Sequence, residues 1–322
     1  MPSIKDVAAL AGVAVGTVSR VINNNGTVTP EIRNRVIAAI EQLKYVPNEV
    51  ARNFKMQKSN LIALLLPTVW HPFFSELAYY VEDELDDCGY KLLLCNSGGK
   101  PWKESYYLDM LEQNKVAGIL GISYNNLDHA VKHDIPMISI DRHFRSNIAC
   151  VTSDNQTGGR MALHELRKAG VRKPAFLGST PQVSSEITLR REGFVQAAAQ
   201  AGLEVIVYEP DEPIVDEDTY FAGFFEVAEE IDGLFAINDL LAANYIIRAA
   251  KRGIRVPEDV KLIGYDGIQN DGLFHPNLST IRQPVEEMAR MSVRLLLQLI
   301  AGQSLEEKVY RLPVYYREGD TT

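Results

Sequence analysis

Apolar residues recur at steps of three and four through the first 43 positions of the chain, which is the spacing of helices with one buried face. Ser3 and Asp6 form a pattern that caps a helix start, and Gly12 allows a tight turn before a second apolar stretch that ends at Ile22. Thr29-Pro30 then opens a third helix. Two short helices cannot bury their apolar faces alone, so the third helix closes the core of a small helix-turn-helix head.

From residue 61 the pattern changes to short apolar runs separated by longer helical stretches. The predicted strands cover residues 61–66, 91–95, 118–122, 137–140, 175–177, 205–208, 233–237 and 260–263. Helices such as 73–89, 157–169 and 240–253 lie between them. Alternation of strand and helix predicts α/β architecture, with parallel sheets covered on both faces. The loops that follow parallel strands meet at one edge of the sheet, where open α/β sheets bind ligands.

Charge is unevenly distributed along the 322 residues. The whole chain has a net charge of -9, yet residues 1–58 contain eight Lys or Arg and four Asp or Glu, a net of +4, which leaves -13 for residues 59–322. A basic head suits contact with the phosphates of a nucleic acid such as DNA, whereas an acidic body is repelled by them. No apolar run approaches the roughly 18 residues of a membrane span, and the N-terminus lacks a signal sequence. We therefore expect a cytoplasmic protein that contacts no membrane.

Four motifs of the head have the order and spacing of one known family: Ile4-Lys5-Asp6-Val7-Ala8, Ala11-Gly12-Val13, Thr17-Val18-Ser19-Arg20-Val21-Ile22-Asn23 and Tyr45-Val46-Pro47-Asn48. Through them the chain resembles the LacI/GalR family of bacterial transcription regulators, and the resemblance extends over nearly its whole length. The resemblance implies DNA contacts by Val15, Gly16, Thr17, Arg20, Asn23, Asn48, Arg52 and Phe54.

Some of these residues are expected to contact base edges, and others are expected to contact phosphates. Arg20 has the fork geometry that recognises a guanine, whereas Val15 offers only an apolar surface and Gly16 offers no side chain. Thr17 and Asn23 suit phosphate contact, which positions the protein without specifying sequence.

Residues 47–58 are expected to form a hinge helix between the head and the body. Asn48 can cap this helix and Arg52 adds positive charge, but a helix so short is marginal alone in water. Phe54, where the family has leucine, suits a wedge driven into the DNA minor groove. An interdomain linker with chance cations is the alternative for this segment.

The body resembles the periplasmic sugar-binding-protein fold, which has two doubly wound lobes, here preceded by the small all-α head. We expect the head at residues 1–46, the hinge at 47–58, and an effector-binding and dimerisation body at 59–322. Its N-lobe would comprise about 59–157 plus 285–312, and its C-lobe about 158–284 plus 313–322, with chain crossings near Thr157, Pro284 and Pro313.

Polar and aromatic side chains cluster where the predicted strands end. The residues expected to bind an effector are His71, Phe73, Phe74, Asp141, Arg142, Asp154, Arg190, Asn238, Asp266 and Gln283. Aromatic faces stack on a sugar ring, while carboxylate, guanidinium and amide groups hydrogen-bond its hydroxyls. The set resembles the ligand-binding residues of ribose-binding proteins, with His71 in place of an asparagine. Taken singly, Phe73 and Phe74 also suit a core, Asn238 and Asp266 a helix cap, and Arg142 a surface ion pair.

Enzyme signatures are weak in this chain. His129 and His133 are four residues apart, but no glutamate follows the first, so the zinc-peptidase pattern fails. No Gly-x-Ser-x-Gly elbow occurs. We therefore predict no catalytic residue, no metal and no cofactor.

The sequence thus predicts a homodimeric repressor that binds a pseudo-palindromic double-stranded operator. A sugar, with ribose as the first candidate, would bind between the lobes and control operator affinity. The resemblance favours an inducer over a corepressor. A purine- or disaccharide-responsive regulator and a sugar receptor without a DNA role remain the alternatives. No leucine heptad follows Pro313, which favours a dimer over a tetramer.

Overall fold

The computed structural model describes residues 2–22, 26, 28–45, 59–113, 115–123, 125, 135–142, 148–181, 183, 185–268 and 276–322. Backbone contacts divide the chain into two compact units, Met1–Ser59 and Asn60–Thr322.

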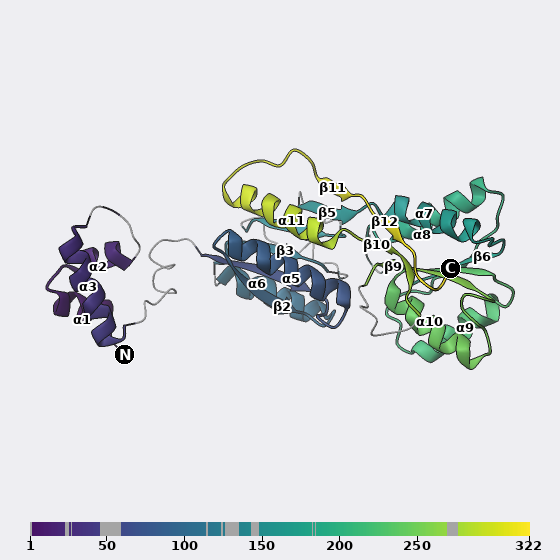
Figure 1. Ribbon diagram of the computed structural model, residues 1–322, viewed down its shortest axis with the longest axis horizontal. Helices are drawn as coiled ribbons and strands as arrows, with labels where there is room; N and C mark the ends of the chain where they lie inside the picture. Colours follow the sequence, from purple (N-terminus) through teal and green to yellow (C-terminus); the bar gives the residue numbers. More distant parts are fainter. Residues whose placement is uncertain are drawn as a thin grey trace. The chain divides into compact units, whose positions relative to one another are not determined.

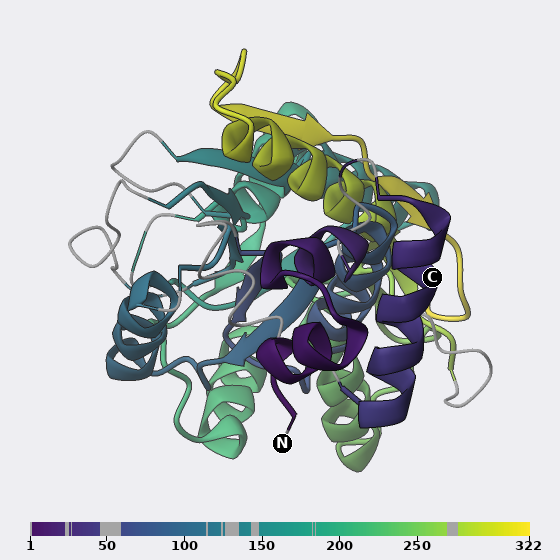
Figure 2. The ribbon, with the colours of Figure 1, turned by 90° about the vertical axis from the view of Figure 1, so that its left-hand side faces the viewer.

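The described residues of the first unit form three helices, drawn in purple in Figures 1 and 2: α1 (Ile4–Ala11), α2 (Val15–Ile22) and α3 (Pro30–Leu43). Each helix contributes to one core, in which Val7, Val18 and Val36 are fully buried. The Asp6 carboxylate accepts a hydrogen bond from the Ser3 backbone N–H (2.7 Å) and stabilises the start of α1. Arg35 of α3 donates to the carbonyl of Ala11, which satisfies the end of α1. The predicted helix-turn-helix head is confirmed.

The second unit begins with a sheet of six parallel strands in the order β11-β5-β4-β3-β1-β2. The strands are β1 (Leu61–Leu66), β2 (Lys91–Asn96), β3 (Gly118–Gly121), β4 (Met137–Ile140), β5 (Ala149–Ser153) and β11 (Val309–Leu312). Both faces of the sheet are covered, which is why its strands are continuous apolar runs. Helices α5 (Pro72–Asp87) and α11 (Val285–Ile300) pack on one face, and α6 (Pro101–Gln113) packs on the other.

A second sheet has the order β12-β10-β9-β8-β6-β7 and is parallel except for β12, which is antiparallel to β10. The strands are β6 (Pro174–Leu177), β7 (Ile206–Tyr208), β8 (Gly233–Ala236), β9 (Lys261–Asp266), β10 (Ser279–Arg282) and β12 (Tyr315–Arg317). Figure 1 shows α7 (Asn155–Lys168) and α8 (Thr188–Gln200) on one side of this sheet, with α9 (Glu217–Val227) and α10 (Asp239–Lys251) on the other. The predicted α/β class, with two doubly wound sheets after a small helical head, is confirmed.

The chain passes between the two sheets three times: from β5 into α7, from β10 into α11, and from β11 into β12. Hydrogen bonds join these crossings to one another. The Ser153 hydroxyl donates to the side-chain oxygen of Gln283 (2.8 Å), and the Asp154 N–H donates to the carbonyl of Leu312 (2.7 Å). The crossings therefore form one connected region between the sheets.

Some predicted strand bounds were wrong, and four strands escaped the sequence pattern. The strand predicted over 260–263 runs to Asp266 as β9, because Tyr265 is a fully buried core residue. Strands β5, β10, β11 and β12 were missed because polar residues such as Thr152 and Thr280 interrupt their apolar runs. Within the described residues, no helix is long and apolar enough to cross a membrane.

Candidate functional site

Arg190 lies at the centre of a buried polar cluster. It lies in the first turn of α8 and is only 3% exposed. Its Nε donates to the side-chain oxygen of Asn155 (2.7 Å), its Nη1 donates to the carbonyl of Ile237 (2.8 Å), and its Cζ lies 3.7 Å from the centre of the Tyr265 ring. Hydrogen bonds and a cation–π contact therefore fix the plane of the guanidinium group.

The α7–α8 contact that brings Asn155 to Arg190 depends on two glycines. A Cβ at Gly159 would lie 2.0 Å from the carbonyl oxygen of Arg190, and one at Gly193 would lie 2.0 Å from the carbonyl oxygen of Gln156. Only residues without a side chain permit this close approach of the two helices.

Asp266 lies beside Arg190 at the end of β9. Its Oδ1 is 3.6 Å from Arg190 Nη1 and accepts a hydrogen bond from the side-chain amide of Gln283 (2.7 Å). Its Oδ2 is 3.8 Å from Nε2 of His71, which caps the start of α5 on the other sheet. Asp266 has a φ of 104°, a conformation that residues other than glycine rarely adopt. The cluster therefore joins both halves of the second unit through a strained backbone position, as binding sites often do.

Asp141 is a second buried carboxylate near the same guanidinium group. It follows β4, is 4% exposed, and also has a positive φ, of 56°. Its Oδ1 accepts a hydrogen bond from the Thr152 hydroxyl (2.7 Å), and the Arg190 charge acts on it. Two carboxylates from different sheets thus share one arginine.

Burial governs the protonation of these groups. Burial raises the pKa of Asp141 and of Asp266, and the Arg190 cation opposes this rise in both. Burial lowers the pKa of His71, although the Asp266 carboxylate opposes this shift. His71 is therefore neutral at physiological pH, in agreement with the hydrogen bond that its Nδ1 accepts from the Phe73 N–H (3.3 Å).

The cluster has hydrogen-bonding capacity that the protein does not use. Among the described residues, Arg190 Nη2, Asp141 Oδ2 and Asp266 Oδ2 have no hydrogen-bond partner. None of these three atoms is among the fully buried side-chain atoms of the described residues that lack a partner, so they remain accessible to a ligand with donors and acceptors. A polyhydroxylated molecule has both.

Other predicted residues have roles within the protein itself. Arg142 is buried, not on the surface, and donates to the carbonyl and hydroxyl of Ser123 (3.3 and 3.2 Å). The side chains of Asn238 and Asp154 cap α10 and α7, respectively, by accepting backbone N–H groups. Phe73 and Phe74 are each 5% exposed and belong to the core of the first sheet. Their contact with an effector stays a prediction.

The predicted set of effector-binding residues left out four supporting residues: Thr152, Ser153, Asn155 and Tyr265. Each of these residues contacts a predicted site residue. For Thr152 and Ser153 the signal available in the sequence is a pair of hydroxyl residues at the end of an apolar run.

The predicted DNA-binding residues fall into two groups. Val15, Gly16 and Arg20 are exposed on α2, and Thr17 is partly buried, while Val18 and Val21 form the buried side of the helix. Their exposure leaves Val15, Gly16 and Arg20 accessible to a groove. Asn23, Asn48, Arg52 and Phe54 lie outside the described residues.

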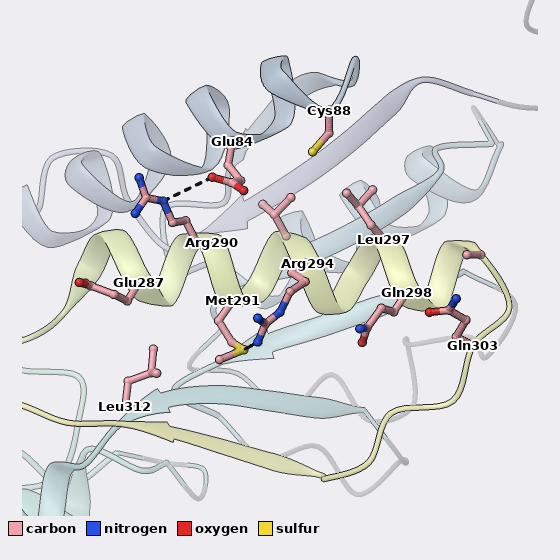
Figure 3. Close-up of a pocket in the computed structure, with 12 residues that line it drawn as sticks. Glu84, Cys88, Glu287, Arg290, Met291, Arg294, Leu297, Gln298, Gln303 and Leu312 are labelled. Carbon is pink, nitrogen blue, oxygen red and sulfur yellow. Dashed lines mark hydrogen bonds and ion pairs between the residues drawn. The ribbon is translucent and has the colours of Figure 1, made fainter.

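A groove of about 720 Å³ between α5 and α11 shares no residue with the polar cluster. Figure 3 shows Glu84 of α5, and Cys88 just after it, on the same side of α11 as Arg290 and Leu297, while Met291 points to the other side, toward Leu312. The groove is lined by charged side chains such as Glu84 and Arg290, which pair with each other, and it contains none of the residues predicted to bind an effector.

Comparison with known proteins gives two matches to family models. Residues 3–48 match bacterial regulatory proteins of the lacI family, and residues 163–322 match a periplasmic binding protein-like domain.

Individual relatives match over most or all of the chain. The ribose operon repressor of Bacillus subtilis (strain 168) is 39% identical over 330 residues, which cover 100% of this chain and 99% of that protein. The sucrose operon repressor of Streptococcus mutans is 38% identical, over 99% of this chain and 98% of that protein. A periplasmic binding protein/LacI transcriptional regulator from Alkaliphilus metalliredigens, solved with D-xylulofuranose, is 32% identical with a TM-score of 0.74, over 82% of this chain and 99% of that one.

Proposed function

Because this chain belongs to the lacI family of bacterial regulatory proteins, we propose that it is a DNA-binding transcriptional repressor whose operator affinity is controlled by a sugar bound in the Arg190 cluster. The family consists of repressors, so we assign no catalytic role. The head, residues 1–46, binds the operator, and the body, residues 59–322, binds the sugar and forms a homodimer.

The observation that carries this proposal is the set of open polar groups around one fixed guanidinium. Arg190 Nη2 can donate to sugar oxygens, while Asp141 Oδ2 and Asp266 Oδ2 can accept from sugar hydroxyls. Hydrogen bonds to charged groups contribute about 1.5–3 kcal/mol each, so three such groups support specific recognition of a small polyol.

A pentose is the first candidate effector. The B. subtilis relative is named a ribose operon repressor, and the Alkaliphilus regulator was solved with a five-carbon sugar. The name of the S. mutans relative makes sucrose, a disaccharide, the second candidate. We further propose that the sugar acts as an inducer, so that its binding between the lobes releases the operator.

DNA reading is assigned to the exposed side of α2. Arg20 contacts a base edge, and Val15, Gly16 and Thr17 lie beside it on the same short helix. Two heads of a homodimer would bind successive half-sites of a pseudo-palindrome, because two-fold protein symmetry requires matching DNA symmetry. The segment 47–58 is proposed to bring Phe54 into the minor groove at the operator centre.

Titration calorimetry and fluorescence anisotropy together test this proposal. The full chain is titrated with ribose, sucrose and guanine in turn, and its affinity for operator DNA is measured with and without each compound. We expect ribose to bind and to weaken operator binding. Sucrose or guanine acting in its place would assign another effector class. Sugar binding without any change in DNA affinity would contradict the repressor, and chemical conversion of the sugar would indicate an enzyme.

Arg191 provides a matched control for the cluster. It follows Arg190 on α8 but is 35% exposed and pairs with Glu209 (2.5 Å). Arg190→Gln should raise the sugar concentration needed for the response at least tenfold, whereas Arg191→Gln should leave it unchanged. An equal loss in both variants would show that the cluster has no specific part in effector binding.

A further inference from the structure

An ion pair outside the effector cluster joins the two halves of the second unit. Glu76 lies on α5, which packs on the first sheet, and Arg282 ends β10 of the second sheet. Arg282 Nη1 donates to Glu76 Oε2 (2.9 Å), and Arg282 Nη2 donates to Glu76 Oε1. This two-pronged geometry is specific for arginine and carboxylate and constrains the direction of approach as well as the distance.

The pair is largely shielded from water. The Arg282 side chain is 10% exposed and the Glu76 side chain is 21% exposed. Exposed ion pairs contribute little to stability because solvent screens them, whereas removing one partner of a shielded pair leaves a charge without its counterion. The energy of the Glu76–Arg282 pair should therefore depend strongly on the relative position of α5 and β10.

Arg282 also holds the turn that presents Asp266. Its Nη1 donates to the carbonyl of Gly267 (2.8 Å), and Gly267 has a φ of 72°. A Cβ at Gly267 would lie 2.3 Å from Cδ of Arg282, so the arginine packs directly against this turn. A shift of Arg282 would therefore be transmitted to the strained Asp266 position.

The same helix carries a residue of the effector cluster. His71 caps α5, and its ring lies 3.8 Å from Asp266, while Glu76 follows five residues later on the same helix. A ligand that binds His71 and Asp266 together and an ion pair that joins Glu76 and Arg282 both hold α5 against the second sheet. Both interactions therefore favour the same arrangement of the lobes.

We propose that the Glu76–Arg282 pair is a latch between the lobes that stabilises their closed, effector-binding arrangement. This inference rests on the proposed function. An effector shifts a two-state equilibrium only through its different affinity for the two states, and a latch present in one state changes the equilibrium before the effector binds. The latch thereby sets the sugar concentration at which the operator is released.

A double-mutant cycle tests the latch. Glu76→Gln keeps the side-chain shape and removes the charge, and we expect it to weaken ribose binding about fivefold or more. The ribose concentration for half-release of operator DNA should rise by the same factor. In an Arg282→Gln background, Glu76→Gln should have no further effect, because the partner is already absent. Unchanged ribose affinity in Glu76→Gln, or an equal effect in both backgrounds, would overturn the latch.

Glu84→Gln is the matched control. Glu84 lies on the same helix and pairs with Arg290 of α11 at 3.6 Å, as the dashed line in Figure 3 shows. Both α5 and α11 pack on the first sheet, so this pair does not join the lobes. Glu84→Gln should leave ribose affinity and operator release unchanged. An effect equal to that of Glu76→Gln would show that loss of any charge on α5 suffices, which overturns the latch.

A distance measurement separates failure of the latch from failure of the proposed function. Spin labels on the exposed Cys88 of the first half and on Val215→Cys of the second report lobe arrangement without ligand. Glu76→Gln should lengthen or broaden this distance relative to the otherwise unmutated protein. An unchanged distance overturns the latch even if ribose binds. Conversely, a changed distance with no response of the wild-type chain to any sugar rejects the proposed effector and keeps the latch.

Discussion

Arg190→Gln gives the most direct test of the effector cluster. The substitution removes the only guanidinium group that lies beside both Asp141 and Asp266 within the described part of the chain. Glutamine keeps a planar polar end but loses the positive charge and the fork of donors. The effector and the two carboxylates therefore lose their cation together.

Arg190→Gln should lower both the affinity for the effector and the folding stability of the protein. Loss of a charged hydrogen bond to a buried hydroxyl costs about 1.5–3 kcal/mol, which is roughly a 10- to 150-fold loss of affinity. Removing one partner of a buried ion pair costs about 3–5 kcal/mol of folding stability. The stability loss should be smaller than this, because Asp266 can take up a proton when its cation is gone.

This proton uptake gives the variant a pH dependence of known sign. Burial raises the pKa of Asp266 in the folded protein and Arg190 opposes that rise, so Arg190→Gln should raise the pKa further. A carboxyl with a raised folded-state pKa holds its proton more tightly folded than unfolded. Its contribution to stability is therefore full at low pH and is lost as the pH rises through the folded pKa. In the variant, the stabilising contribution of Asp266 should be lost over a higher pH range than in the wild type.

Calorimetric titration with ribose and chemical denaturation at several pH values measure both parts. We expect at least a tenfold weaker effector, and a stability difference from the wild type that grows as the pH rises. Operator affinity without ligand should change little, because Arg190 belongs to the unit that does not contain the head. A folded variant with wild-type ribose affinity would refute the assignment of Arg190 to the effector site.

Three further predictions concern other parts of the chain. Arg20→Ala should cost about 1–3 kcal/mol on operator DNA and relax preference at one base position; an equal loss on random DNA in anisotropy titrations would make Arg20 a phosphate contact. Gly193→Ala places a Cβ 2.0 Å from the Gln156 carbonyl oxygen and should destabilise the protein by about 1–3 kcal/mol through separation of α7 and α8; an unchanged melting temperature would argue against that tight crossing. Burial raises the pKa of Asp239 from 3.8 to about 7, so the contribution of this protonated carboxyl to stability should be lost as the pH rises between these values. Asp239→Asn should therefore flatten the dependence of the unfolding free energy on pH, and identical pH profiles in the variant and the wild type would contradict this.

The sequence by itself determined the architecture, because periodicity and turn chemistry are local. Apolar steps of three and four in the head and buried runs in the body correspond to the observed helices and central strands. Local patterns failed where polar residues enter a strand. No strand was predicted over residues 149–153, although β5 runs through the polar residues Thr152 and Ser153 and both are fully buried.

Only the tertiary structure decided how the candidate site is built. The sequence could select Arg190, Asp141 and Asp266 as chemically apt, but they are far apart along the chain and their proximity depends on how helices and strands pack. Tyr265 under the guanidinium and Glu76 opposite Arg282 have no local sequence signal at all. Such contacts arise from pairing between residues up to 206 positions apart, and no periodic pattern within one segment encodes them.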